Sequence, residues 1–344
     1  MTGATGFIAQ HCIVQLLNAG YDVRGTARTP GRTAEVAGII APHLIASART
    51  HLEECFHVVT ADLTDDQGWE PAVAECRFVL HVASPFPSTL PRNDDELIIP
   101  ARDGALRVLR AASAGGVERV VLTSSVAAIW YGRARDHRFD EEDWSDLTGP
   151  NIGAYAKSKT IAERAAWRFI ESLGPDATMD LVVINPGLVL GPLLTKQSST
   201  SAQLVKRLLE HSVPAIPDVR LATVDVRDVA AVHVAALTAP EASGERFICA
   251  SVDARMRDVA LILADRYSNQ GFRVPTRQVP KFVLRIVALW DRQARLLLPE
   301  VGHPVDFDSD KIRRVLGFSP RDLREMTISM ADSMILFGVV TPTP

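Results

Sequence analysis

The chain has 344 residues and a mass of 37.5 kDa, a length that fits two packed units or one enlarged α/β domain with an appendage. Its composition, 47% hydrophobic and 23% charged with 21 glycines and 21 prolines, excludes a disordered chain and a collagen-like fibre. The formal net charge of −4 leaves no surplus of lysine and arginine for a phosphate backbone, which argues against nucleic acid as a partner.

The first half of the chain alternates short β-branched runs with longer amphipathic segments, the pattern of βα units around a parallel sheet. In chain order we predict a helix at 7–18, strands at 22–26 and 57–60, a helix at 68–75, a strand at 78–83, a helix at 95–113, a strand at 119–123, a helix at 154–173 and a strand at 181–185. This order predicts an α/β fold with a doubly wound parallel sheet.

Beyond residue 185 the alternation weakens, and a mixed region carries the rest of the chain. We predict a loop and helix to about residue 210, a strand–helix unit at 222–237, a short strand at 246–249 and terminal helices. Residues 1–186 form the predicted dinucleotide-binding domain, to which 222–250 return. Residues 187–221 and 251–340 form a smaller, interleaved substrate-binding domain.

The apolar stretch at 282–290 lies in this second domain and has helical spacing. It can line a substrate pocket or an interface, but we expect it to pack in the core.

A glycine-rich turn, TGATGFIA, occupies residues 2–9. Gly3 allows a tight turn, Gly6 permits close backbone approach, and the small Ala9 lets a helix pack on the sheet. The spacing is typical of a turn that directs the first amides of a helix toward a pyrophosphate. The alternative is an ordinary glycine-rich turn, because this spacing recurs by chance.

A dinucleotide loop is expected to follow a strand, yet only Met1 precedes this turn. The missing first strand is expected to have about 5 or 6 residues and to lie at the centre of the sheet. We therefore hypothesise that the native reading frame begins upstream. We also expect a chain that begins here to be poorly stable unless something else fills the gap, because two strands then lack ladder partners.

The strand predicted at 22–26 is followed by Arg28, with no carboxylate before Glu35. In dinucleotide-binding folds an acidic residue at this place accepts from the ribose of NAD, whereas an arginine accommodates the 2′-phosphate of NADP. The sequence therefore favours NADP. The alternative is that Arg28 is an ordinary surface arginine.

Tyr155 and Lys159 stand four residues apart at the start of a predicted helix, hence on one face. An adjacent ammonium is expected to stabilise the phenolate and to lower the pKa of Tyr155 toward the working range. Ser125 closes the strand at 119–123 and can donate to a carbonyl oxygen from the carboxyl edge of the sheet. A plain surface helix and a serine that caps a turn are the alternatives.

These residues resemble the extended short-chain dehydrogenase/reductases, in the branch of dihydroflavonol reductases, cinnamoyl-CoA reductases and bacterial aldehyde reductases. The similarity spans nearly the whole chain. Besides residues 2–9, 122–125 and 155–159 it includes ADL at 61–63, HVASP at 81–85, TIAE at 160–163, NPG at 185–187, DVRDVA at 225–230 and GERF at 244–247.

The resemblance implies a Rossmann domain and a carbonyl-reducing site. Tyr155 becomes the general acid, Lys159 binds the nicotinamide ribose and tunes the phenol, and Ser125 orients the carbonyl. The implied cofactor contacts are Gly3, Thr5, Gly6, Phe7, Ile8, Arg28, Asp62, Leu63, Val82, Ala83, Ser84, Tyr155, Lys159, Pro186, Gly187, Leu188 and Val189. Asp62 and Leu63 meet the adenine, Val82 to Ser84 the dinucleotide backbone, and Pro186 to Val189 the nicotinamide side.

Two departures bear on function. Cinnamoyl-CoA reductases carry an aromatic-rich stretch around the tyrosine, whereas small residues surround Tyr155 here, which disfavours acyl-CoA reduction. Arg107 stands where many relatives have asparagine, so no role of that asparagine is carried over.

We expect an NADP(H)-dependent reductase of a small aldehyde or ketone, monomeric or homodimeric. A nucleotide-sugar epimerase or dehydratase that retains NAD is the second hypothesis, and a non-catalytic dinucleotide sensor is the third.

The remaining polar residues predict no metal site. The acidic run at 140–143 is expected to face solvent, and His81 and His233 to be core histidines. Cys12, Cys55, Cys76 and Cys249 form no C-x-x-C pair and are interpreted as reduced, mostly buried thiols. No apolar run approaches the roughly 18 to 20 residues of a membrane span, and no signal-peptide pattern is present, so we expect a cytoplasmic protein without a membrane partner.

Overall fold

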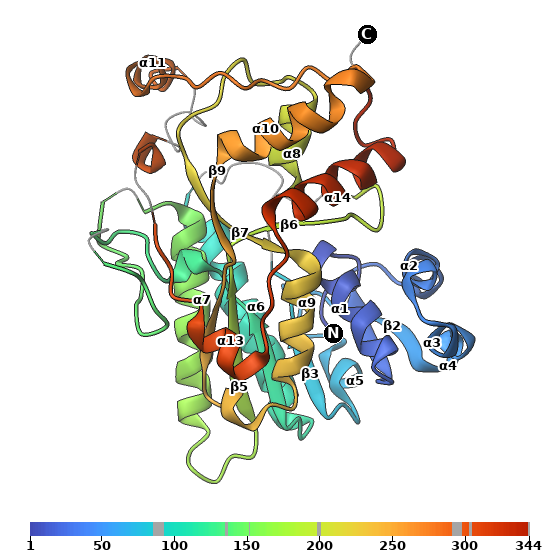
Figure 1. The fold of residues 1–344 in the computed structure, drawn as a ribbon. Helices are drawn as coiled ribbons and strands as arrows, with labels where there is room; N and C mark the ends of the chain where they lie inside the picture. The colour runs from blue at the N-terminus through green and yellow to red at the C-terminus, as the bar shows by residue number, and fades with distance from the viewer. Residues whose placement is uncertain are drawn as a thin grey trace.

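The computed structural model describes residues 1–84, 93–134, 137–150, 152–197, 201–290, 298–302 and 305–342. Strands run side by side through the lower body of the molecule with helices on either side of them, and a second group of helices lies above them (Figure 1). Pro85, which belongs to the motif at 81–85, lies outside the described residues.

The main sheet consists of two parallel groups of strands. The first group consists of β1 and β2, and the second group has the order β3-β4-β5-β8. The bounds are β1 (Val23–Ala27), β2 (Phe56–Thr60), β3 (Phe78–His81), β4 (Arg119–Thr123), β5 (Asp180–Pro186) and β8 (Arg246–Cys249). Every residue of β4 is buried, in keeping with the apolar run at its centre, Val120 to Leu122. The predicted α/β fold with parallel strands is confirmed.

Helices cover both faces of this sheet, so it is doubly wound. On β4, Val121 belongs to a core shared with α1 and α9, whereas Val120 and Leu122 belong to a core shared with α6 and α7. These four helices are α1 (Phe7–Asn18), α6 (Asp95–Ala114), α7 (Ala154–Ser172) and α9 (Val226–Ala236). Shorter helices complete this part: α2 (Thr33–Ile40), α3 (Ala46–Thr50), α4 (Leu52–Cys55), α5 (Trp69–Val73) and α13 (Asp310–Leu316).

Residues 1–4 lie between β1 and β3, at the centre of the sheet. The Met1 carbonyl accepts from the Thr26 N–H (2.9 Å), and the Ala4 N–H donates to the Thr26 carbonyl (2.8 Å). On the other side, the Thr2 N–H donates to the Leu80 carbonyl (3.0 Å). The expectation that β1 and β3 lack ladder partners is therefore wrong near their carboxyl ends, because these four residues bridge them.

Toward the amino ends of β1 and β3 the two strands border a cavity of about 440 Å³. Its walls include Val23 and Arg24 from β1, Phe78 and Leu80 from β3, and Met1. The hypothesis that the reading frame begins upstream stays a prediction.

A smaller sheet and further helices, α8 (Ala202–Leu209), α10 (Met256–Tyr267) and α14 (Leu323–Leu336) among them, lie in the upper part of Figure 1. β6 (Leu188–Leu190) pairs in parallel with β7 (Arg220–Asp225), and β7 pairs antiparallel with β9 (Val252–Arg255). Leu188 and Leu190 of β6 share a core with α8, α10 and α14. The proposed division into two domains stays a prediction.

The apolar stretch at 282–290 is not a core segment, contrary to the sequence-based expectation. It contains α11 (Lys281–Val287), whose Leu284 is buried together with Ala288. Phe282, Leu289 and Trp290 are 64%, 66% and 79% exposed. Helical spacing of apolar residues marks one face of a helix. Because α11 lies at the edge of the molecule, only part of its apolar face is covered by other residues (Figure 1).

All four cysteines are free thiols. Cys12 and Cys249 are fully buried, whereas Cys55 and Cys76 are half-buried beside the gap between β1 and β3. Among the described residues, no helix is both long and apolar enough to cross a membrane.

Buried histidines occupy the core, as predicted for His81 and His233. His233 Nδ1 donates to the Val229 carbonyl (2.7 Å), so its Nε2 accepts from the Thr123 hydroxyl (2.7 Å). Burial lowers the pKa of His233 to about 4, that of His11 to about 4 and that of His81 to about 3. All three are neutral in the folded protein at pH 7.

We predict that the free energy of unfolding falls as the pH drops from 6.5 to 4. The unfolded chain binds protons on these imidazoles below pH 6.5, whereas folded His233 does so only near pH 4. This difference corresponds to about 3 kcal/mol for one such histidine at pH 4. Urea unfolding at a series of pH values measures it, and His233→Gln is expected to flatten the dependence. The exposed His57→Gln is the control, and an unchanged slope in His233→Gln contradicts the explanation.

Candidate active site

The glycine turn at the start of the chain leads directly into α1. Gly3 has φ +68°, a conformation that side chains rarely adopt, and a Cβ there lies 2.9 Å from the Ala83 Cβ. The Ala83 N–H donates to the Thr2 hydroxyl (3.0 Å), so the segment after β3 is held against this turn. The structure thus brings together two of the segments predicted to bind the dinucleotide.

The start of α1 suits a pyrophosphate. Within the described part of the chain, no side chain caps this helix, and its first turn carries no acidic residue. The amides of the first turn therefore remain available for an anion, and the helix dipole favours negative charge there. Together with the close approach at Gly3, this arrangement fits the dinucleotide that the sequence predicts.

The segment after β2 is ordered by its own hydrogen bonds. The pKa of Asp62 lies below its ordinary value, chiefly because the Thr64 N–H donates to it, and the charges of Arg28 and Arg107 add to this effect. Arg107 also contacts the Leu63 carbonyl and Asp66. The arginine that departs from the family pattern thus holds the segment predicted to meet the adenine.

The segment after β5 lies beside Ser125, whose hydroxyl donates to the Pro186 carbonyl (3.4 Å). The Gly187 N–H donates to the Cys249 carbonyl (3.1 Å), and Leu188 begins β6. The side chain of Val189 is buried in the core, so the predicted cofactor contact of this residue concerns its backbone.

The three predicted catalytic side chains meet at the carboxyl end of β4. Ser125 follows β4, and its hydroxyl hydrogen-bonds the phenol of Tyr155. Lys159 lies one helical turn after Tyr155 on α7, and its Nζ donates to the Thr123 carbonyl (3.5 Å). Tyr155 is 39% exposed, whereas Ser125 is buried. The arrangement can orient a carbonyl oxygen and deliver a proton to it.

Burial dominates the electrostatics of this group. It raises the pKa of Tyr155 above its ordinary value, and the hydrogen bond with Ser125 opposes that rise. Burial lowers the pKa of Lys159 to about 8, and the Glu163 carboxylate opposes that fall. The Lys159 ammonium is directed to the Thr123 carbonyl, so the lowering of the Tyr155 pKa by Lys159 stays a prediction.

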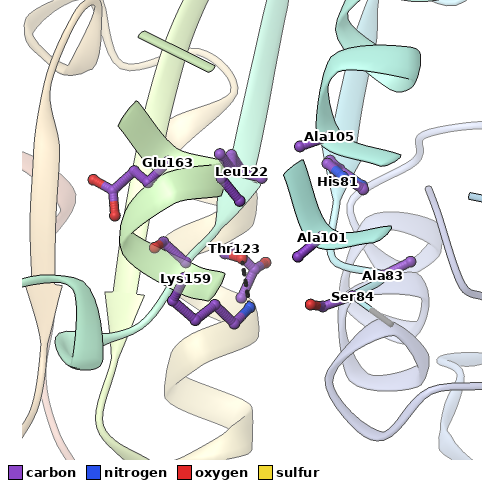
Figure 2. Close-up of a pocket in the computed structure, with 11 residues that line it drawn as sticks. His81, Ala83, Ser84, Ala101, Ala105, Leu122, Thr123, Lys159 and Glu163 are labelled. Carbon is purple, nitrogen blue, oxygen red and sulfur yellow. Dashed lines mark hydrogen bonds between the residues drawn. The ribbon is translucent and has the colours of Figure 1, made fainter. Parts of the chain in front are cut away.

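Lys159 crosses the floor of a small cavity of about 20 Å³ between β3 and β4 (Figure 2). Ala83 and Ser84 line the opposite wall, and Ala101 and Ala105 of α6 lie above them (Figure 2). Residues predicted to meet the dinucleotide backbone and the nicotinamide ribose therefore share this cavity.

A buried polar group behind the site was missed at the level of sequence. Asn185 and Arg246 both donate to the Glu163 carboxylate although the three residues come from separate elements. Their motifs, TIAE, NPG and GERF, were recognised only as family patterns, and no spacing within the sequence indicates that they meet.

The acidic run at 140–143 is only partly exposed, contrary to expectation. Asp140 and Glu142 face solvent, but Glu141 accepts from the Ile248 N–H (3.0 Å) and Asp143 pairs with Arg133 and His137. In the part of the chain that the structure describes, no group of three or more His, Cys, Asp or Glu residues is placed to hold a metal ion.

Residues 1–250 match the family model described as the NAD dependent epimerase/dehydratase family. The chain belongs to this family. Its relatives also confirm the resemblance to the reductase branch of the extended short-chain dehydrogenase/reductases. Cinnamoyl-CoA reductase 1 of Petunia hybrida is 36% identical over 286 residues, which cover 80% of this chain and 79% of that protein.

Similarity to one yeast enzyme extends over almost the whole chain. The NADPH-dependent methylglyoxal reductase GRE2 of Saccharomyces cerevisiae is 31% identical and covers 98% of both chains. The crystal structure of yeast methylglyoxal/isovaleraldehyde reductase Gre2 with NADPH superposes with a TM-score of 0.80 at 28% identity, again over 98% of each chain. Vestitone reductase from alfalfa, at 24% identity and a TM-score of 0.73, shares the fold.

We predict that Gly3→Ala weakens NADPH binding about tenfold, because the left-handed backbone is strained and the added methyl group displaces Ala83. Gly20→Ala is the matched control: Gly20 follows α1, has φ +83° and has open space around it. Fluorescence titration with NADPH measures both variants. Equal losses of affinity in the two proteins contradict a role of Gly3 in the binding turn.

Proposed function

We propose that this protein reduces a small aldehyde or ketone to the alcohol with NADPH. The main support for this proposal is that Ser125, Tyr155 and Lys159 meet at the carboxyl end of β4, beside the glycine turn and the uncapped start of α1. The reductase activity of the relatives, including the NADPH-dependent yeast enzyme, supports the same conclusion.

The protein's own groups act on the carbonyl oxygen. Ser125 donates a hydrogen bond that orients it, and Tyr155, which is protonated at neutral pH, delivers the proton as negative charge develops there. Lys159, charged at neutral pH, faces the phenolate that results and binds the nicotinamide ribose. When bound, reduced nicotinamide supplies the hydride to the carbonyl carbon.

Cofactor preference rests on Arg28 in this proposal. Arg28 is exposed after β1 and lies close enough to Asp62 to affect its pKa. Nearby Arg32 is already paired with Glu35. Arg28 is therefore the residue that binds the 2′-phosphate of NADP, as such a group requires a cation at this edge of the sheet.

The substrate is a free aldehyde or ketone and not an acyl-CoA, because small residues surround Tyr155. Methylglyoxal and isovaleraldehyde, the substrates named for the yeast relative, define the size class to test first. A cytoplasmic location and a monomeric or homodimeric state remain predictions of the sequence.

Tyr155→Phe is expected to reduce kcat by about 10² to 10⁴-fold, because the variant has no proton to donate. Affinity for NADPH is expected to change little. NADPH oxidation with a panel of aliphatic, aromatic and α-keto carbonyls measures turnover, and fluorescence titration measures binding. Tyr21→Phe, at a half-buried tyrosine away from the site, is the control. Full turnover in Tyr155→Phe removes the proposed acid, and tightly retained NAD without turnover in the wild type favours an epimerase instead.

Arg28→Ala is expected to weaken NADPH binding about 10- to 100-fold and to leave NADH binding nearly unchanged, because one charge-assisted hydrogen bond to the phosphate is lost. Arg77→Ala, at the amino end of β3, removes an equally exposed arginine on the other side of the sheet and serves as control. Kd values for both dinucleotides measure the change in preference. A parallel loss for NADPH and NADH contradicts the assignment.

A further inference from the structure

A buried carboxylate lies directly behind the site. Glu163 is on α7, one helical turn beyond Lys159, and is 1% exposed. Its Oε1 accepts from Arg246 Nε on β8 (2.5 Å), and its Oε2 accepts from Asn185 Nδ2 on β5 (2.9 Å). Three elements that hold the site therefore converge on one side chain.

Asn185 connects this carboxylate to the serine. Besides donating to Glu163, its Nδ2 donates to the backbone carbonyl of Ser125 (3.1 Å). The Asn185 Oδ1 atom is buried and has no hydrogen-bond partner among the described residues. Only one end of this amide is therefore bonded, and both of its bonds fix the turn that presents Ser125 to the carbonyl.

Arg246 extends the network to the segment before α7. Its guanidinium donates to the carbonyls of Glu141 (2.7 Å) and Asp143 (2.9 Å) and lies over the Trp144 ring, 3.8 Å from the centroid. A buried ion pair of this kind adds little net stability over apolar residues of the same volume, because both charges lose their hydration. Its presence here is better explained by what it holds in place.

Glu163 is the carboxylate whose charge acts on Lys159. His81 from β3 is neutral, and Tyr155 on α7 is protonated at neutral pH. The other charged groups nearby are engaged: Asp94 of α6 pairs with Lys157, and Arg246 of β8 pairs with Glu163 itself. Figure 2 shows Glu163 and Lys159 on consecutive turns of α7. The Glu163 charge opposes the lowering of the Lys159 pKa by burial.

We propose that Glu163, held by Arg246, is a positioning residue for carbonyl reduction: through Asn185 it fixes the Ser125 turn, and it places a negative charge one turn of α7 beyond Lys159. The inference rests on the proposed function, since it names a residue that serves Ser125 and Lys159. It gives the GERF and TIAE motifs a shared task, because each contributes one partner of the ion pair.

Glu163→Gln tests the electrostatic part. The amide keeps the shape of the side chain but removes its charge, so the pKa of Lys159 is expected to fall further and the ammonium to be lost at lower pH. The alkaline limb of the kcat/KM profile should then move to lower pH by about one unit. A profile with the wild-type limb overturns this part of the proposal.

Two further variants separate this effect from loss of stability. Asp180→Asn deprives Arg119 of a bidentate, largely buried partner at the opposite end of β5, so a comparable fall in Tm is expected with no shift of the limb. Glu163→Gln/Arg246→Met removes both charges and is expected to recover stability while the limb stays shifted. If Asp180→Asn shifts the limb equally, the effect is a general consequence of destabilisation and the proposal fails.

Asn185→Leu tests the mechanical part, because it frees the Ser125 carbonyl without changing a charge. We expect kcat to fall about tenfold, with the alkaline limb and the Kd for NADPH unchanged. A kcat equal to the wild-type value contradicts the link through Asn185.

The Lys159 pKa can also be measured without cofactor or turnover. Reductive ¹³C-methylation of the lysines, with Lys159 assigned by Lys159→Arg, gives an NMR titration of the ligand-free protein. Glu163→Gln should lower that pKa, and an unchanged value overturns the electrostatic part of the proposal. If the wild type reduces no carbonyl, the proposed function fails, but this titration still decides whether Glu163 sets the charge of Lys159.

Discussion

Parallel pairing of β3, β4 and β5 is the constraint on which the site depends. The register places Leu122 beside His81 and Thr123 beside Ile184, so the three strands end at one edge of the sheet. Because every residue of β4 is buried, that edge has little freedom to shift. Ser125 and Asn185, sixty residues apart in the chain, are thereby held within hydrogen-bond distance, and α7 packs where its first turns reach both.

Much of this fold follows from local patterns. Strands covered on both faces are apolar runs, and α1 begins at Phe7 and ends at Asn18, as its flanking Gly6 and Gly20 indicate. Strand ends are less well defined by sequence. β3 stops at His81, two residues short of its predicted end, and the Ala83 N–H donates to the Thr2 side chain instead of to a neighbouring strand.

The sequence could not show which groups a side chain contacts or in which direction it points. The spacing of Tyr155 and Lys159 places them on one face, but it does not show that Nζ turns to the Thr123 carbonyl. Apolar spacing at 282–290 likewise marks a helix face without showing what covers it. The Glu163–Arg246 pair joins residues 83 apart, a separation at which local patterns carry no information.

The four cysteines differ in reactivity according to whether they lie in the core or beside the gap between β1 and β3. Burial raises the pKa of the Cys12 thiol to about 12 and raises that of Cys249, so neither forms the thiolate that attacks electrophiles. Cys55 and Cys76 instead border the gap. Alkylating reagents therefore reach the molecule first along the walls of this opening, and whatever occupies it shields both sulfurs, so that two native side chains already report on its occupancy.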